Sequence, residues 1–154
     1  MAKIVVLGIG NLLMRDDGVG VHVINALRKC NLPNDVEVVD GGILGIDLLS
    51  VVEDADMLIV IDAVDVGASP GEIVELSDDL LAPSQCPMSL HDFRIGDVLR
   101  IAEMRGKRPR CIVLIGIQVA DVSCGDALSP QLAVHLDNYV QTVFEKLNAY
   151  RTGA

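Results

Sequence analysis

The apolar residues of the chain gather in short segments that end in a glycine or a polar side chain. Residues 3–8, 36–42, 57–64 and 111–118 are rich in Val, Ile and Leu, and each of them predicts a buried strand. Residues 71–76 alternate apolar and polar side chains, which predicts an edge strand. The chain is therefore expected to build one sheet from these segments.

Apolar side chains recur at helical spacing between the predicted strands. In the C-terminal segment, Ser129 is a suitable N-cap and Pro130 a suitable first helical residue. The amphipathic pattern then continues without interruption to residue 151, so it predicts one long helix there. The predicted helices are residues 18–30, 46–55, 93–106 and 129–151.

The alternation of strands and helices indicates the fold class. Residues 77–92 contain Pro83 and Pro87 and few periodic positions, so they predict a loop. Strands that alternate with helices are typical of a parallel sheet covered on both faces. We expect a single α/β domain over residues 1–154, with a twisted, mostly parallel sheet in a Rossmann-like three-layer α/β/α arrangement.

The composition indicates what kind of core the protein has and which classes of binding partner it disfavours. Hydrophobic residues make up 51% of the chain and aromatic residues only 3%, so the core must be aliphatic. The net charge of −10 disfavours nucleic acid and anionic membranes as partners. The apolar N-terminal run is too short to cross a membrane, and no signal-peptide cleavage site follows it. The four cysteines lack metal-binding or redox spacing, so we expect a cytoplasmic protein with free thiols and no membrane insertion.

The segment GIGNLLMRDDGVG at residues 8–20 allows a nucleotide site or a metal site. A dinucleotide fingerprint needs a third glycine where this chain has Leu13. Asp40 ends the second strand, where a ribose-binding acid would stand, and this favours the nucleotide hypothesis. However, Asp16 and Asp17 would repel a pyrophosphate placed at the start of the following helix. We therefore expect no nucleotide cofactor.

Acidic residues follow several predicted strands at one edge of the sheet. Asp16 and Asp17 follow the first strand, Asp40 ends the second, and Asp62 lies near the end of the third. Helix capping would explain one of the paired aspartates. It does not explain Asp62, because an unpaired charge at the end of an apolar strand is costly to bury. Two carboxylates and an imidazole would suit a divalent ion such as Ni²⁺, Zn²⁺, Fe²⁺ or Mn²⁺.

Three histidines could supply that imidazole. His22 and His135 fall inside predicted helices, where packing or solvent exposure is the simpler interpretation. His91 lies in the predicted loop and is the best candidate by position. Spacing alone leaves this choice open.

The ordered motifs resemble the nickel–iron hydrogenase maturation endopeptidases over residues 3 to about 147. The resemblance rests on GIGNLLMRDDGVG (8–20), VDGG (39–42), IDA (61–63), His91 and GIQ (116–118). It implies a protease that removes a short C-terminal peptide from a hydrogenase large-subunit precursor after nickel has been inserted. The nickel would then belong to the substrate and would not be a resident ion.

The resemblance also implies roles for individual residues. Asp17, Asp62 and His91 match the family's metal-contacting residues. Asp16 and Asp40 match acids with less certain roles in catalysis or substrate handling. Two features depart from common family patterns: Val119 and Ala120 follow GIQ where relatives often have Pro and an acid, and Asp17 is the shorter of the two acids found at its position.

The sequence also bears on the chemical mechanism. The chain has no G-x-S-x-G elbow, and its Cys and Ser residues lack a convincing His partner, so a covalent nucleophile is not predicted. Attack by water, assisted by a metal or an aspartate, is the remaining route. One alternative is a nickel-sensing chaperone that binds the precursor without cleaving it. The other is a nucleotide-binding α/β protein.

Overall fold

The computed structural model describes residues 2–43, 45–76 and 95–153, and these residues form an α/β fold around one sheet. The strands lie in the order β2-β1-β3-β5-β4. The first four in this order are parallel, and β4 runs antiparallel to β5 at the edge. The strands are β1 (Ile4–Ile9), β2 (Val36–Gly42), β3 (Met57–Val64), β4 (Ile73–Leu76) and β5 (Cys111–Gln118).

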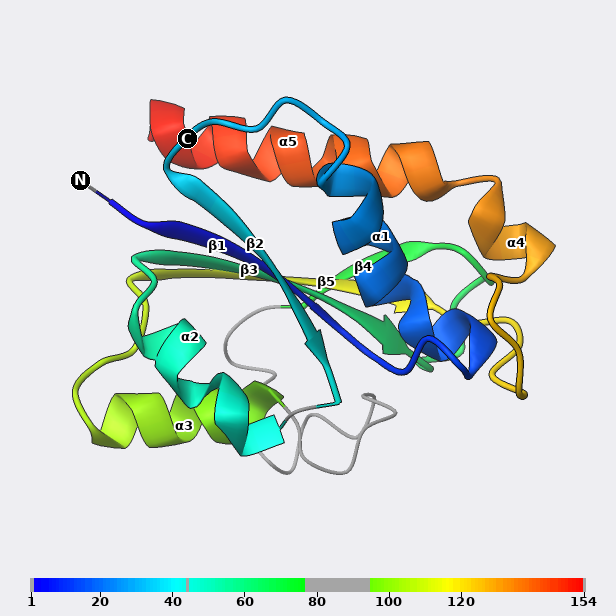
Figure 1. Ribbon diagram of the computed structural model, residues 1–154, viewed down its shortest axis with the longest axis horizontal. Coiled ribbons are helices and arrows are strands. Elements are labelled where there is room, and N and C mark those ends of the chain that lie inside the picture. Colours follow the sequence, from blue (N-terminus) through cyan, green and yellow to red (C-terminus); the bar gives the residue numbers. More distant parts are fainter. Residues whose placement is uncertain (1, 44, 77–94, 154) are drawn as a thin grey trace.

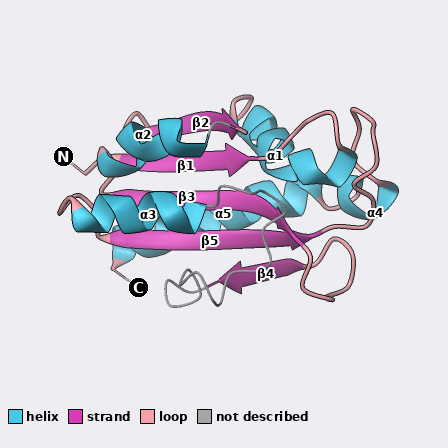
Figure 2. Cartoon of the chain, turned by 90° about the horizontal axis from the view of Figure 1, so that it is seen from below, coloured by secondary structure: helices cyan, strands magenta, loops and turns pink. Residues whose placement is uncertain are grey.

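Helices cover both faces of the sheet and produce three layers (Figure 1). The helices α1 (Val19–Leu27) and α5 (Leu136–Thr152) lie on one face. The opposite face carries α2 (Leu49–Glu53) and α3 (Ile95–Met104), and Figure 2 looks onto it. Shorter turns are η1 (Arg15–Gly18), η2 (Gly45–Leu48) and α4 (Pro130–Ala133). The predicted mostly parallel, three-layer α/β fold is therefore confirmed.

The core consists of one aliphatic cluster on each side of the sheet. Every residue of β1 and β3 is buried, because both strands are central and covered on both faces. Alternate side chains of β3 point to opposite faces. Ile59 and Ile61 pack with α1 and α5, whereas Leu58 and Val60 pack with α2 and α3.

The predicted bounds agree for three strands and fail for the last helix. The strands at 36–42, 57–64 and 111–118 have the predicted limits. The helix predicted over residues 129–151 is wrong as one element, because the chain leaves the helix between α4 and α5. His135 was expected inside this helix, but it is the exposed N-cap of α5. The apolar spacing continues across the break, so the periodicity could not reveal it.

Two other predicted helices are shorter than expected. The helix expected over residues 18–30 is α1, which spans only Val19–Leu27, and the preceding Asp16 and Asp17 lie in η1. The segment expected to be helical over residues 46–55 is divided between η2 and α2. The predicted loop at 77–92 lies outside the described residues. Within the described parts of the chain, none of the helices is long and apolar enough to span a membrane.

Candidate functional site at the carboxyl edge of the sheet

The parallel strands bring several polar side chains to one edge of the sheet. Asp40 lies near the end of β2, Asp62 near the end of β3, and Gln118 ends β5. The turn η1 follows β1 and contacts β3, so it places Asp17 at the same edge. Ligands of open α/β sheets bind outside this edge, at the carboxyl ends of the strands.

Close backbone packing brings the start of α1 against β1 and β3. A Cβ atom on Gly8 would lie 2.4 Å from the carbonyl oxygen of Gly20. A Cβ atom on Gly20 would lie 2.3 Å from the carbonyl oxygen of Ile61, the residue before Asp62. Only glycine allows these approaches. Since Asp17 lies three residues before Gly20, the same contacts bring it toward the end of β3.

Asp17 is nearly buried and is oriented by the loop after β1. Its side chain is 6% exposed, and its Oδ2 accepts a hydrogen bond from the backbone N–H of Asn11 at 3.0 Å. Gly10 adopts a φ of 138° beside it, and a Cβ there would lie 2.0 Å from the Asp17 carbonyl oxygen. The glycine-rich segment thus forms a tight turn around Asp17.

Asp62 is the other nearly buried acid of the predicted metal-contacting set. It is 8% exposed, and its Oδ1 accepts a hydrogen bond from the Ala63 N–H at 2.8 Å. By strand alternation it lies on the face of the sheet that carries α2 and α3. The third residue of the set, His91, lies outside the described residues. Among the described residues, 2–43, 45–76 and 95–153, we find no group of three or more His, Cys, Asp or Glu side chains that could hold a metal ion.

Asp16 differs sharply from its neighbour, because it is completely buried and faces the segment after β5. Its Oδ2 accepts hydrogen bonds from the N–H groups of Ala120 and Asp121, both at 2.9 Å. Ser129 donates twice, from its backbone N–H to Oδ1 and from its Oγ to Oδ2, both at 2.8 Å. Ser129 is the N-cap residue of α4, as predicted, but its hydroxyl bonds to Asp16 and does not cap the helix.

Asp40 and Asp121 are two of the exposed acids at this edge. Asp40 pairs with Gly8 in the β1–β2 register, and its side chain is exposed. The pKa of Asp121 is lowered by hydrogen bonds from the hydroxyl and the N–H of Ser123, and Arg15 Nε lies 3.7 Å from its carboxylate. Asp40 is therefore open to a substrate, whereas Asp121 is engaged by its own loop.

Gln118 has a structural role that its position at a strand end did not reveal. Its Oε1 accepts hydrogen bonds from the N–H groups of Val66 and Ala68, at 2.9 and 3.2 Å. Its Nε2 donates to the Asp65 carboxylate at 3.1 Å. The buried amide thus holds the loop that follows β3. In the sequence, this structural role of Gln118 is signalled only by the position of an amide side chain at the end of an apolar run.

His22 is half-buried on α1, and its imidazole interacts electrostatically with the carboxylate of Asp16. Burial lowers the pKa of the His22 imidazole, and the charges of Asp16 and Asp126 oppose this shift. Its Nε2 is buried without a hydrogen-bond partner in the described residues. The expectation that His22 is a packed helical residue agrees with this position.

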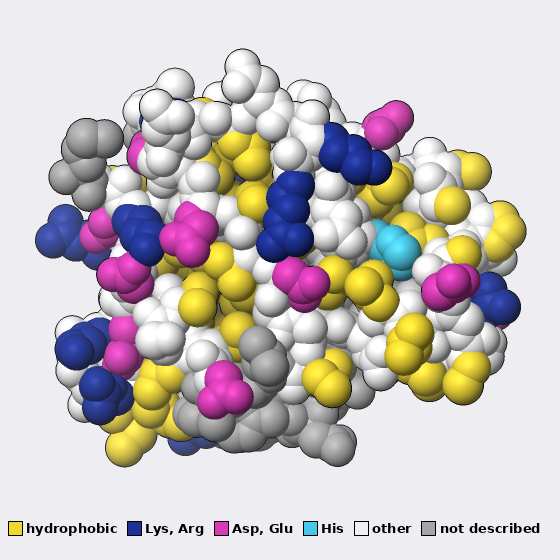
Figure 3. Space-filling model, viewed as in Figure 1, with side chains coloured by type: hydrophobic (Ala, Val, Ile, Leu, Met, Phe, Trp, Pro, Cys, Tyr) yellow, Lys and Arg dark blue, Asp and Glu magenta, His cyan; other side chains and the backbone are white. Residues whose placement is uncertain are grey.

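The two ends of the strands differ in surface chemistry. Charged side chains of both signs crowd the end where the strands begin, while several hydrophobic side chains are exposed toward the other end (Figure 3). Leu13 is 68% exposed, Ile43 71% and Val122 37%, and they lie in the loops after β1, β2 and β5. We call these three residues the apolar rim.

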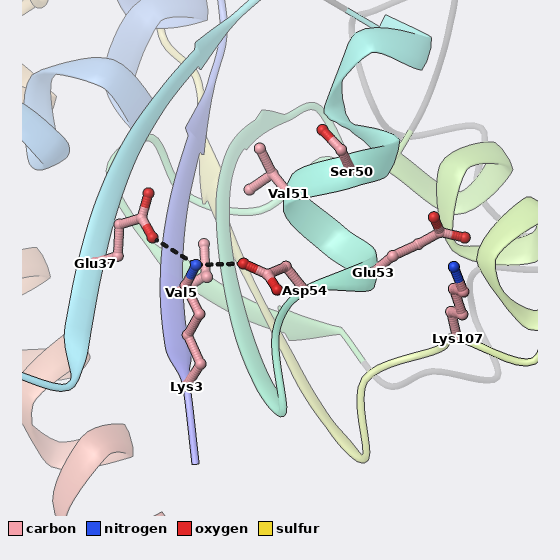
Figure 4. A pocket seen from close by; sticks show the side chains of 8 residues that line it. All are labelled: Lys3, Val5, Glu37, Ser50, Val51, Glu53, Asp54 and Lys107. Atoms are coloured by element: carbon pink, nitrogen blue, oxygen red, sulfur yellow. Dashed lines mark hydrogen bonds and ion pairs between the residues drawn. The ribbon is translucent and has the colours of Figure 1, made fainter. Parts of the chain in front are cut away.

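A cavity of about 660 Å³ lies at the amino ends of β1 and β2, away from the acids described above (Figure 4). Lys3 forms ion pairs there with both Glu37 and Asp54. Glu53, which also lines the cavity, pairs with Arg105 at 2.6 Å. These charges satisfy one another, so the carboxyl edge is the better candidate site.

Comparison with known proteins identifies relatives of this chain. The sequence model of a family described as hydrogenase maturation protease (HycI) matches residues 21–146. The chain is 38% identical over 149 residues to the hydrogenase expression/formation protein HupD of Thiocapsa roseopersicina, and the match covers 94% of this chain and 67% of the relative.

Solved structures give the same result at the level of the fold. The chain is similar to the hydrogenase maturating endopeptidase HybD of E. coli, with a TM-score of 0.87, 27% identity and coverage of 96% of this chain and 93% of the other. It is also similar to a [NiFe] hydrogenase maturation protease HycI from Thermococcus kodakarensis KOD1, with a TM-score of 0.78, 25% identity and the same coverage, 96% and 93%. These matches confirm the resemblance found in the motifs.

Proposed function

This chain belongs to the hydrogenase maturation protease family, and we propose that it removes a short C-terminal peptide from the precursor of a nickel–iron hydrogenase large subunit. The observation that carries the proposal is the pair of nearly buried acids, Asp17 and Asp62, at the carboxyl edge of the sheet. Their side chains are only 6% and 8% exposed, and each accepts a backbone hydrogen bond that orients it. Two oriented carboxylates at one edge of the sheet supply oxygen ligands of the kind that a metal-bearing substrate would bind.

We propose that the metal is nickel already inserted in the precursor, and that Asp17, Asp62 and His91 contact it. Carboxylate oxygen and imidazole nitrogen suit an ion of intermediate hardness such as Ni²⁺. The two acids reach the edge from separate elements, η1 and β3, whose packing is fixed by glycine contacts. A rigid site of this kind would accept the nickel-loaded precursor and bind the nickel-free form less well.

Cleavage would proceed by attack of water on the scissile carbonyl carbon. The C–N bond then breaks, and the leaving amine takes up a proton. A carboxylate near the scissile bond could accept the proton of the attacking water. Asp40 is exposed at this edge, so it is the residue that we propose for proton transfer or for handling the substrate.

The apolar rim supports docking of a protein at this edge. Leu13, Ile43 and Val122 are exposed on the three loops that surround the acids. Backbone hydrogen bonds link these loops: the Gly10 N–H donates to Gly42 O at 2.9 Å, and the Gly125 N–H donates to Leu13 O at 2.9 Å. The three loops are therefore joined to one another, and their exposed apolar side chains could pack against apolar side chains of the precursor.

The test is to incubate the protein with nickel-loaded and nickel-free precursor and to measure the mass of the large subunit. We expect a shorter product only from the nickel-loaded form. Equal cleavage of both forms would contradict nickel recognition. An unchanged mass of the nickel-loaded form, together with stable binding, would instead favour the non-cleaving chaperone.

A further inference from the structure

We propose that Asp16 is a positioning residue, which ties the segment after β5 to the loop after β1 and thereby holds Asp17 in place. The family resemblance implies for Asp16 a less certain role in catalysis or substrate handling. The structure gives the two acids different environments, since Asp16 has no exposed surface and four donors surround its carboxylate. The inference assigns a role within the proposed peptidase site, and in that respect it rests on the proposed function.

The hydrogen bonds of Asp16 use both of its oxygens. Oδ2 accepts from Ala120 N–H, Asp121 N–H and Ser129 Oγ, and Oδ1 accepts from Ser129 N–H. The four distances lie between 2.8 and 2.9 Å. A carboxylate is an acceptor only, so a set made entirely of donors matches it. A group enclosed in this way cannot reach a substrate.

Backbone hydrogen bonds extend the same connection. The N–H of Asp16 donates to Asp121 O at 3.1 Å, and the N–H of Arg15 donates to Gly125 O at 3.0 Å. Arg15 adopts a φ of 47°, a left-handed conformation that a non-glycine residue keeps only where its surroundings impose it. The two loops are thus held together around the turn that carries the acids.

This connection determines where Asp17 points. Asp16 and Asp17 are consecutive residues of a 3-10 turn, in which neighbouring side chains are about 120° apart around the axis. When Asp16 is fixed toward Ser129, Asp17 must therefore face another direction, where it accepts from Asn11. Loss of the Asp16 contacts should release η1 and disorient Asp17.

The substitution Asp16→Asn is a sharp probe, because the amide replaces one acceptor oxygen with a donor. In one orientation its NH₂ group faces the N–H groups of Ala120 and Asp121, and in the other it faces the N–H of Ser129. In either orientation the NH₂ group of the asparagine faces a backbone N–H, so two hydrogen-bond donors meet and no hydrogen bond forms. Ser129→Ala is milder, since it removes the Oγ contact alone and keeps the backbone N–H. Glu145→Gln changes an exposed acid of α5 and is the charge-matched control.

Two measurements test the proposal. In the isolated protein, amide hydrogen exchange at Ala120, Asp121 and Ser129 should become about tenfold faster or more in Asp16→Asn, because hydrogen bonds to a charged group are lost. In cleavage of nickel-loaded precursor, Asp16→Asn and Ser129→Ala should both raise KM and lower kcat. The double variant should be no worse than Asp16→Asn alone, since both changes break the same contacts. Glu145→Gln should behave as wild type in both measurements.

Different outcomes separate this inference from the proposed function. Loss of kcat in Asp16→Asn with unchanged KM and unchanged amide exchange would overturn the positioning role in favour of catalysis. Wild-type exchange and wild-type kinetics in Asp16→Asn would overturn it as well. If the wild-type protein does not cleave the precursor, the proposed function fails, whereas the exchange measurement still decides whether Asp16 holds the two loops together.

Discussion

Gly8 and Gly20 lie in backbone contact, so that a Cβ atom on Gly8 would come within 2.4 Å of the Gly20 carbonyl oxygen. Gly20 in turn faces the Ile61 carbonyl oxygen, next to Asp62. The helix α1 can therefore approach the sheet closely only because both positions lack a side chain. This approach brings the η1 turn, with Asp17, to the end of β3.

Gly20→Ala should lower the free energy of unfolding and the cleavage rate together. The added methyl group meets backbone atoms, which cannot move aside as a flexible side chain can. Overpacking of this kind costs about 1–3 kcal/mol. Denaturant unfolding measures the loss. Gly67→Ala is the control, because it meets no atom within 4 Å and pays only for its φ of 76°. A smaller effect at Gly20 than at Gly67 would contradict the close approach.

Asp17→Asn and Asp62→Asn should abolish processing of the nickel-loaded precursor without unfolding the protein. In each case the amide oxygen can still accept the observed backbone hydrogen bond, from Asn11 or from Ala63. The charge that would contact nickel is lost. Product mass and thermal unfolding measure the two effects. His91→Ala should likewise abolish processing. Normal processing by all three variants would refute the assignment of the site.

Replacing Leu13 and Ile43 of the apolar rim with serine should raise KM and leave kcat nearly unchanged. Both side chains are highly exposed, so their removal should barely affect folding. If the precursor buries them, the loss of apolar contact should raise KM roughly 3- to 10-fold for each residue. Met104→Ser, at an 87% exposed position at the end of α3, is the matched control and should keep the wild-type KM. An equal KM for all these variants would show that the precursor docks elsewhere.

Tyr139→Phe should destabilise the protein and alter its stability in alkali. The buried Tyr139 hydroxyl donates to Gly71 O at 2.7 Å, and its loss leaves that carbonyl without this donor, at a cost of about 1–3 kcal/mol. Burial raises the pKa of Tyr139 from 10.0 to about 12.

The pH dependence has a definite sign. A raised pKa in the folded state means that the contribution of Tyr139 is complete below pH 10.0 and is lost as the pH rises toward about 12. The free energy of unfolding, measured across this pH range, should therefore fall more steeply in the wild type than in Tyr139→Phe. Tyr150→Phe, at the other tyrosine, is the control. Identical slopes in wild type and Tyr139→Phe would contradict the role of this hydroxyl.

The sequence by itself determined the strands, the fold class and the edge at which the acids gather. The segments 36–42, 57–64 and 111–118 could be recognised because buried parallel strands need continuous apolar side chains. Asp62 was conspicuous for the same reason, as an acid within such a segment. Parallel strands share a carboxyl edge, so the sequence alone predicts that Asp17, Asp40 and Asp62 lie together there.

Only the tertiary structure decided what the individual polar residues do. Asp16 and Asp17 are identical and adjacent in the sequence, and they differ because Ser129, 113 residues from Asp16, lies beside only one of them. The break between α4 and α5 also could not be read from the sequence, since the apolar spacing runs through it. Local patterns record which residues are buried. They do not record which distant donor a buried carboxylate meets, because that depends on how separate elements pack.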